Sequence, residues 1–156
     1  VKDAAFRTVA VRSDVFPGGR VYYCEHRTPE LVWRPEWQSH GNGASSMPEF
    51  VIVSNDHERE ASDFARLLNT DISGSNGWLA VAYQGGQLTL MSPASYTERY
   101  GVVASAMNGR SSIFGALVFR TDDLDKARAS GTPVIDEANR VVIREENFDS
   151  VLEFIG

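Results

Sequence analysis

The sequence has 156 residues, of which 42% are hydrophobic and 23% charged, as in soluble globular domains. This composition excludes a disordered, collagen-like or coiled-coil chain. The formal net charge of −6 and the lack of a basic run argue against a nucleic-acid partner. No segment approaches the roughly 20 apolar residues that would cross a membrane. Cys24 is the only cysteine, which excludes an intrachain disulfide and fits a cytoplasmic location.

The first region, residues 1–46, is predicted to hold a hairpin and a long covering loop. Residues 6–12 alternate weakly between polar and apolar, and residues 20–26 are rich in strand-forming side chains after the turn signal Pro17-Gly18-Gly19. Residues 29–46 lack periodicity, and we expect a structured loop with one helical turn. The chain does not begin with Met, so this region could also be the seam of a longer protein.

The second region, residues 47–93, reads as strand, helix and hairpin. Residues 50–53 form a short apolar strand. The following helix carries Ala61, Phe64, Ala65, Leu67 and Leu68 on one face. We expect its charged residues, Glu60 among them, to form a solvated face. A cluster of Ser, Gly and Asn at residues 73–77 is expected to end the helix. Residues 78–83 and 88–91 are expected to form a hairpin.

A linker, residues 94–110, leads to the third region, residues 111–156, which repeats the order of the second. A strand at 113–119 precedes a short helix that starts at Asp122-Asp123 and ends at Gly131. Short strands follow at 133–135, 140–144 and 151–155. Each unit is too small to bury its sheet alone, so we expect one compact α+β domain in which the two units pack as halves.

Three stretches resemble the glyoxalase-like domains of the vicinal oxygen chelate superfamily. They are Ala116–Ala127, which resembles the first strand and helix start of a module, Ser150–Ile155, which resembles a last strand, and Cys24–Trp37 with His40–Ala44. The third stretch is the most specific. The resemblance implies two βαβββ modules paired around a curved-sheet cavity, with an N-terminal β-hairpin and long loop. In larger relatives, the third stretch follows another module pair.

The resemblance also implies where a divalent metal would be held, by His and Glu side chains of the inner strands. The corresponding places are near Glu49 and near Gly115 or Ala116 for the first strands, and Thr89 and Glu153 for the last strands. No His lies at either strand start, so the usual ligand set is incomplete. We therefore predict no metal site and no cofactor.

Two residues are candidate catalytic groups, Glu153 and His26. Glu153 shares a strand face with Val151 and Ile155, so it is either a cavity acid serving as a general base or a solvent-facing carboxylate. His26 is on a strand with Cys24 on the same face. It could act as a base, bind a metal, orient a loop or simply satisfy a backbone carbonyl. Cys24 has no basic cluster that would activate its thiol.

The remaining candidate ligand-binding residues lie in the loop. Trp33 and Trp37 are four apart and either anchor the loop or form a stacking wall for a ligand. Arg34 could bind a carboxylate or pair with Glu30 or Glu36. His40 and Asn42 sit in a glycine-rich turn and could contact a ligand.

These features predict a domain that binds a small molecule between the modules, with lyase, isomerase or dioxygenase activity possible. The alternatives are a metal-free binding module and a degenerate, structural half of a longer protein. We expect a small-molecule ligand and no nucleic-acid or membrane partner. A homodimer or a further glyoxalase-like module remains an open alternative.

Overall fold

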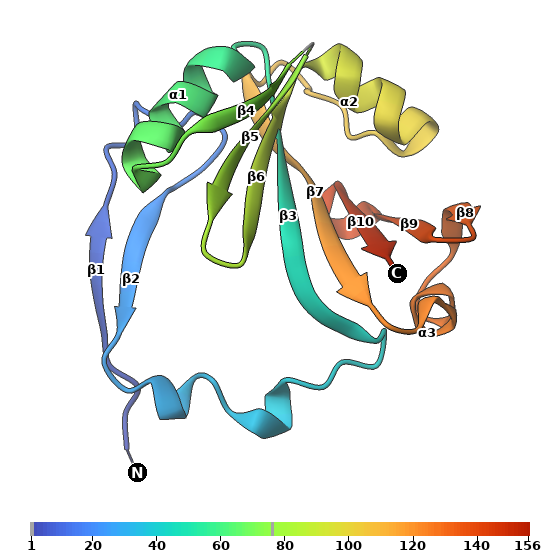
Figure 1. The fold of residues 1–156 in the computed structure, drawn as a ribbon, viewed down its shortest axis with the longest axis horizontal. Helices are drawn as coiled ribbons and strands as arrows, with labels where there is room; N and C mark the ends of the chain where they lie inside the picture. The colour runs from blue at the N-terminus through green and yellow to red at the C-terminus, as the bar shows by residue number, and fades with distance from the viewer. Residues whose placement is uncertain (1, 76) are drawn as a thin grey trace.

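The computed structural model describes residues 2–75 and 77–156 of the chain. Val1 and Asn76, which belong to the predicted first and second regions, lie outside the described residues. Within that part, no helix has the length and apolar character needed to cross a bilayer. Figure 1 shows a curved main sheet with a separate two-stranded ribbon beside it.

The main sheet has eight strands and contains two units of identical element order. The first unit is β3 (Ala44–Ser54), α1 (His57–Leu68), β4 (Ile72–Ser75), β5 (Trp78–Tyr83) and β6 (Gly86–Met91). The second is β7 (Ser112–Thr121), α3 (Leu124–Ala129), β8 (Pro133–Glu137), β9 (Arg140–Glu145) and β10 (Ser150–Ile155). The predicted α+β fold of two βαβββ modules is therefore confirmed.

The strand order β4-β5-β6-β3-β7-β10-β9-β8 places the two units edge to edge. Strands β3 and β7 pair antiparallel at the centre, and each pairs parallel with the last strand of its own unit. The two halves are thus related by an approximate twofold arrangement. Three register shifts between β3 and β7 bend the sheet at this junction.

One face of the sheet, here called the outer face, is covered by α1 and α3. Helix α1 buries Ala61 and Phe64 against Ile52, Val81 and Leu90. Helix α3 buries Ala127 against Val141, Ile143 and Phe154. The apolar side of α1 that the sequence predicted therefore packs against the sheet.

The opposite, inner face is covered by a helix that was not predicted. Helix α2 (Pro93–Tyr100) lies in the linker between the two units and continues into a 3₁₀ turn, Gly101–Val103. Ser92 caps it by accepting a hydrogen bond from the Ser95 backbone, and Pro93 occupies its first turn. Its buried Tyr96 and Tyr100 pack on the centre of the inner face.

Two further local predictions were wrong. Residues 72–75 form the edge strand β4 by pairing with β5, although the residues from 73 on were assigned to a helix-ending cluster. Glu60 is only 1% exposed, not part of a solvated face. Its two carboxyl oxygens accept hydrogen bonds from Ser54 at 2.6 Å and Ser112 at 3.1 Å, so both buried oxygens have a partner.

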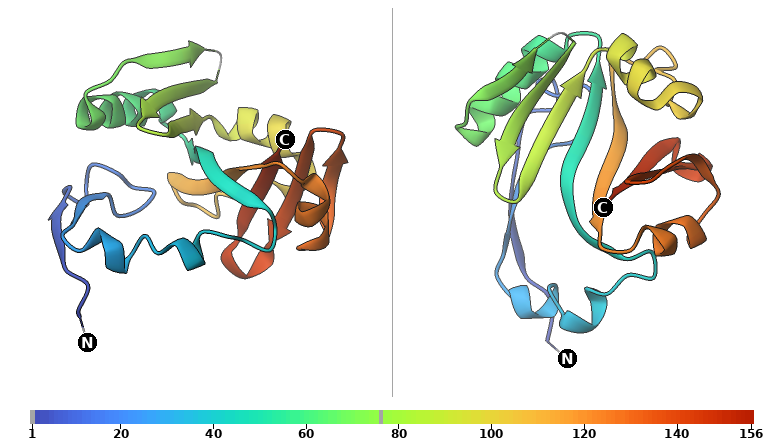
Figure 2. Two further views of the ribbon diagram at one scale, coloured as in Figure 1. Left: turned by 60° about the horizontal axis from the view of Figure 1, so that its bottom comes forward. Right: turned by 45° about the vertical axis from the view of Figure 1, so that its right-hand side comes forward.

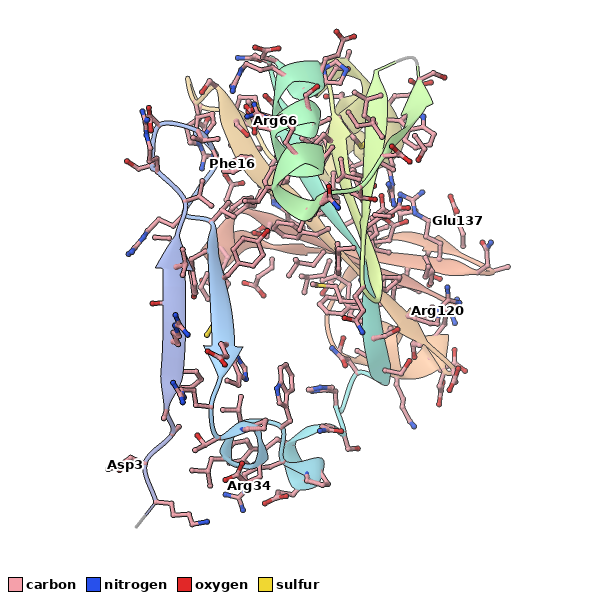
Figure 3. The ribbon with its side chains drawn as sticks, turned by 60° about the vertical axis from the view of Figure 1, so that its left-hand side comes forward. Asp3, Phe16, Arg34, Arg66, Arg120 and Glu137 are labelled. Carbon is pink, nitrogen blue, oxygen red and sulfur yellow. The ribbon has the colours of Figure 1, made fainter. Side chains whose placement is uncertain are left out.

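The N-terminal hairpin stands beside the main sheet (Figure 2). Its strands β1 (Phe6–Ala10) and β2 (Tyr22–His26) pair antiparallel with each other alone. Phe16, labelled in Figure 3, attaches the intervening loop to the body. Its ring stacks on that of Phe64 in α1, with 4.1 Å between the ring centroids. Two 3₁₀ turns, Pro29–Leu31 and Pro35–Trp37, lead from β2 to β3. The predicted hairpin and long loop are both present.

Candidate functional site

The centre of the inner face carries two acidic side chains in one row of the sheet. Strand register aligns Glu49 on β3 with Val118 on β7, and Val118 with Glu153 on β10. Glu153 is 3% exposed, so it does not face solvent. The prediction that it shares a face with Val151 and Ile155 is consistent with this register, because partners in a ladder project to the same side.

Arg99 of α2 lies between the two acids and bonds to both. Its Nη1 and Nη2 donate to the two oxygens of Glu49 at 2.8 and 2.9 Å, a bidentate pair. Its Nη2 also donates to Oε2 of Glu153 at 2.8 Å. One guanidinium therefore bridges the first strand of one module and the last strand of the other.

Tyr100 and Arg140 complete the bonding of Glu153. The Tyr100 hydroxyl donates to Oε2 at 2.7 Å, and Arg140 Nε donates to Oε1 at 2.7 Å. Arg140 also donates to the backbone carbonyl of Arg99 at 3.1 Å. The Tyr100 ring has both guanidiniums near its face, at 5.1 and 5.6 Å from its centroid.

The ionisation of these groups follows from burial and pairing. Burial alone would raise the pKa of Glu49, but the hydrogen bonds and charge of Arg99 and the Thr89 hydroxyl outweigh it, so the pKa is lowered. Burial alone would lower the pKa of Arg99, but its hydrogen bonds to Glu49 and the nearby carboxylates of Glu49 and Glu153 raise it. Burial, with Glu153 nearby, raises the pKa of Tyr100. Two carboxylic side chains and two guanidinium side chains give the cluster a formal charge balance of zero.

A pocket of about 300 Å³ remains on the inner face next to this cluster. It is lined by Glu49, Trp78, Gln87, Thr89, Met91 and Arg99. Gln87 donates from its side-chain amide to the Thr89 hydroxyl at 3.0 Å, which orients both groups. The pocket thus offers a partly exposed indole ring next to amide, hydroxyl and carboxylate groups.

The candidate residues on the hairpin lie elsewhere. His26, on β2, stacks on Trp33 at 5.4 Å and meets the edge of Phe6 at 5.2 Å. Its Nδ1 is buried without a hydrogen-bond partner among the described residues. Cys24 is exposed on the same strand, opposite Thr8. His26 therefore belongs to an aromatic stack at the base of the hairpin, apart from Glu153.

The loop candidates form two further groups. Arg34 pairs with Glu36 and lies over the ring of Trp37 at 4.7 Å, on an exposed surface. His40 and Asn42 together line two shallow hollows, one toward Met47 and Phe119 and one toward α3. Asn42 accepts a hydrogen bond from the Ala44 backbone at 3.1 Å, which closes the turn. The predicted site residues are thus spread over several places.

Sequence reasoning missed Arg99, Tyr100 and Arg140. A signal for α2 was present, because Ser92-Pro93 is a helix start of the kind that places a capping hydroxyl before a first-turn proline. Tyr96 and Tyr100 lie four apart and predict a shared helical face. Nothing local indicates that the arginine between them would meet Glu49 and Glu153, which are 50 and 54 residues away in sequence.

The residues at the positions implied for a metal do not fit a divalent cation. All four carboxylate oxygens of Glu49 and Glu153 accept hydrogen bonds from arginine or tyrosine. Thr89 and Gly115 or Ala116, which offer no carboxylate or imidazole, take the other two places. In the described ranges no three His, Cys, Asp or Glu side chains converge as metal ligands. The Arg99 guanidinium supplies the positive charge that a metal would bring.

Comparisons with known proteins were made by sequence and by structure. No family model and no curated protein matches this sequence. Among solved structures, a hypothetical protein from Staphylococcus aureus matches with a TM-score of 0.57 and 8% identity, over 97% of this chain and 49% of that chain. This chain thus spans about half the length of the S. aureus protein.

Two further matches have lower TM-scores. Methylmalonyl-CoA epimerase from Mycobacterium tuberculosis matches with a TM-score of 0.49 and 16% identity, over 76% of this chain and 92% of that chain. A glyoxalase/bleomycin resistance protein/dioxygenase from Nocardioides matches with a TM-score of 0.33 and 16% identity, over 81% of this chain and 91% of that chain. Identities this low bear on fold alone. The chain has the fold that the sequence resemblance implied, with two βαβββ modules side by side in one sheet.

Proposed function

We propose that this chain is a metal-independent domain that binds a small molecule on the inner face of its sheet. The observation that carries the proposal is the bridging of Glu49 and Glu153 by Arg99. A metal competing for these two acids would have to displace a guanidinium that makes three hydrogen bonds to them, and breaking such a partly buried ion pair is costly.

Glu153 is better suited to hold the site together than to act as a general base. A base needs a carboxylate oxygen within hydrogen-bond reach of the substrate proton. Here Oε1 accepts from Arg140, and Oε2 accepts from both Arg99 and Tyr100. This favours ligand binding over lyase, isomerase or dioxygenase chemistry.

The ligand class follows from the pocket beside the cluster. Because the charges cancel, the pocket does not favour an anion or a cation. Trp78 offers a flat apolar surface, while Gln87 and Thr89 offer hydrogen-bonding groups. Volumes of 300–1,000 Å³ are typical for small-molecule sites, and about 300 Å³ is at the lower end. A small, neutral, planar molecule with an amide group matches these features.

Benzamide and benzoate are suitable probes, because they share a ring and differ in charge. We expect benzamide to shift the backbone and side-chain NMR resonances of Trp78, Gln87 and Thr89 with a Kd on the order of 1 mM. Benzoate should bind more weakly. Trp78→Leu should weaken benzamide binding, whereas the matched control Trp33→Leu, on the exposed loop, should not. Absence of shifts at the pocket with benzamide would refute this site.

Metal independence is tested separately with Mn²⁺, a paramagnetic ion. At an equimolar concentration it should leave the resonances of Glu49, Thr89 and Glu153 sharp. Selective broadening of these three would contradict the proposal, even if benzamide binds.

A cytoplasmic location is proposed because the chain has a single cysteine. The exposed position of Cys24 is compatible with it.

A second candidate function, an interaction surface, is favoured by the hairpin. All residues of β1 and all but His26 of β2 are exposed, with Phe6, Val9, Tyr22 and Tyr23 between 49% and 61%. A two-stranded ribbon with so much exposed apolar surface is only marginally stable by itself. We propose that a second copy of this chain covers it.

The oligomeric state tests this second candidate. Sedimentation should show a dimer at micromolar concentration, and Val9→Glu with Tyr22→Glu should give a monomer with an intact main sheet. Lys2→Glu, outside the strands, is the matched charge control and should leave the dimer unchanged. A monomer at all concentrations would refute the assignment of a second copy to this surface.

A further inference from the structure

The molecule has a second, larger apolar pocket outside the inner face. It has a volume of about 400 Å³ and lies between α1, the outer face of the first module and the start of β2. Its walls are almost entirely apolar or aromatic: Val21, Tyr22, Tyr23, Phe50, Ile52, Phe64, Leu67, Leu68, Tyr83, Leu88 and Phe114, with Arg20 as the charged member. The inner-face cluster takes no part in it.

The pocket is held open by contacts between the hairpin and the body. The Tyr23 hydroxyl donates to the backbone carbonyl of Leu67 at the end of α1. Phe16 stacks on Phe64, and the turn before β2 approaches β7 closely: a Cβ added at Gly19 would lie 2.5 Å from the Phe114 ring. These attachments fix one wall of the pocket relative to the other, so the space does not close by a simple shift of the loop.

Polar groups in the wall are few, and one of them is charged. Arg20 is an exposed residue of the pocket wall, and among the described residues its side chain has no hydrogen bond or ion pair. Burial raises the pKa of Tyr83, so its hydroxyl stays protonated and able to donate. An apolar ligand with an anionic end would place its chain against the aromatic walls and its charge at Arg20.

We propose that this pocket binds a small apolar carboxylate, such as a medium-chain acyl or arylalkyl acid. At roughly 30 Å³ for each non-hydrogen atom, the pocket holds about a dozen atoms. Octanoate, with eight carbons and two oxygens, fits within this volume. The site is on the α1 side of the sheet, so it is independent of the ligand site proposed on the inner face, and it shares Tyr22 and Tyr23 with the hairpin surface.

Octanoate and 1-octanol are the probes, because they share a chain and differ in charge. Calorimetry on the whole chain should show one octanoate bound with a Kd on the order of 0.1–1 mM, tighter than 1-octanol. Arg20→Gln should weaken octanoate binding about threefold to fivefold and leave 1-octanol unchanged. The matched control Arg7→Gln, on β1 and outside the pocket wall, should leave both unchanged.

A second variant keeps the test independent of the charge. Val21→Trp fills the pocket from the hairpin side and should abolish binding of both probes, while the resonances of the inner-face pocket stay in place. Three results would overturn the proposal: no octanoate binding at 5 mM, equal affinity for octanoate and 1-octanol, or equal effects of Arg20→Gln and Arg7→Gln. Benzamide binding at Trp78 is unaffected by any of these outcomes.

Discussion

The Arg99 bridge makes a sharp prediction about stability. Replacing Arg99 with Met keeps much of the side-chain volume but removes the charge shared by Glu49 and Glu153. Their side chains are 15% and 4% exposed, so water cannot fully replace the guanidinium. Breaking a buried pair by removing one partner typically costs 3–5 kcal/mol, and we expect about 3–5 kcal/mol here at pH 7. For a chain of this size, that corresponds to a drop in Tm of roughly 6–20 °C.

The loss of stability caused by Arg99→Met should increase with pH. In the wild type, the pKa of Glu49 is below its ordinary value, so its ionised form stabilises the fold above pH about 4.3. Without Arg99, burial raises that pKa. The penalty for ionised carboxylates is then absent at low pH and grows as the pH rises above about 4.3. Arg99→Met should therefore be much less harmful at pH 4 than at pH 7.

Urea denaturation at both pH values measures this difference. Arg59→Met is the matched control, because Arg59 makes two ion pairs on the exposed side of α1 with Asp56 and Asp63. Exposed pairs contribute about 0–1 kcal/mol. The double variant Arg99→Met with Glu49→Gln should recover part of the loss. If Arg99→Met costs no more than Arg59→Met, or costs the same at pH 4 and pH 7, the buried-bridge argument is wrong.

Three further outcomes are expected from unfolding measurements. Gly115→Ala should cost about 1–3 kcal/mol, because the added Cβ would lie 2.7 Å from Val53 and 2.9 Å from Tyr96. Gly41 has open space around it, so Gly41→Ala should change the free energy of unfolding little. Tyr100→Phe should cost about 1–3 kcal/mol, because it removes the hydrogen bond that the Tyr100 hydroxyl donates to the buried Glu153. An effect as small as that of Tyr22→Phe, at an exposed residue, would count against this role of Tyr100. Wild-type stability should fall on acidification below pH about 4.3, and a flat profile down to pH 3 would contradict the lowered pKa of Glu49.

The sequence by itself determined the repeated order of strand and helix in the two units and the buried apolar side of α1, but not α2, β4 or the burial of Glu60. The spacing of Ala61 and Phe64 predicted the buried side of α1, and the alternation around Glu153 predicted its neighbours on β10. Such patterns depend on residues within a few positions of each other, and helical or strand periodicity is enough to interpret them. The duplicated order of strand and helix then led to the α+β fold of paired modules.

Only the tertiary structure decided what the acids contact. Arg99, Glu49 and Glu153 come from α2, β3 and β10, and their meeting depends on the register of two central strands and the path of the linker. The burial of Glu60 likewise depends on Ser112, 52 residues away. Local periodicity carries no information on such distant pairings. That is why the polar bridge at the centre of the inner face could be found only once the chain was folded.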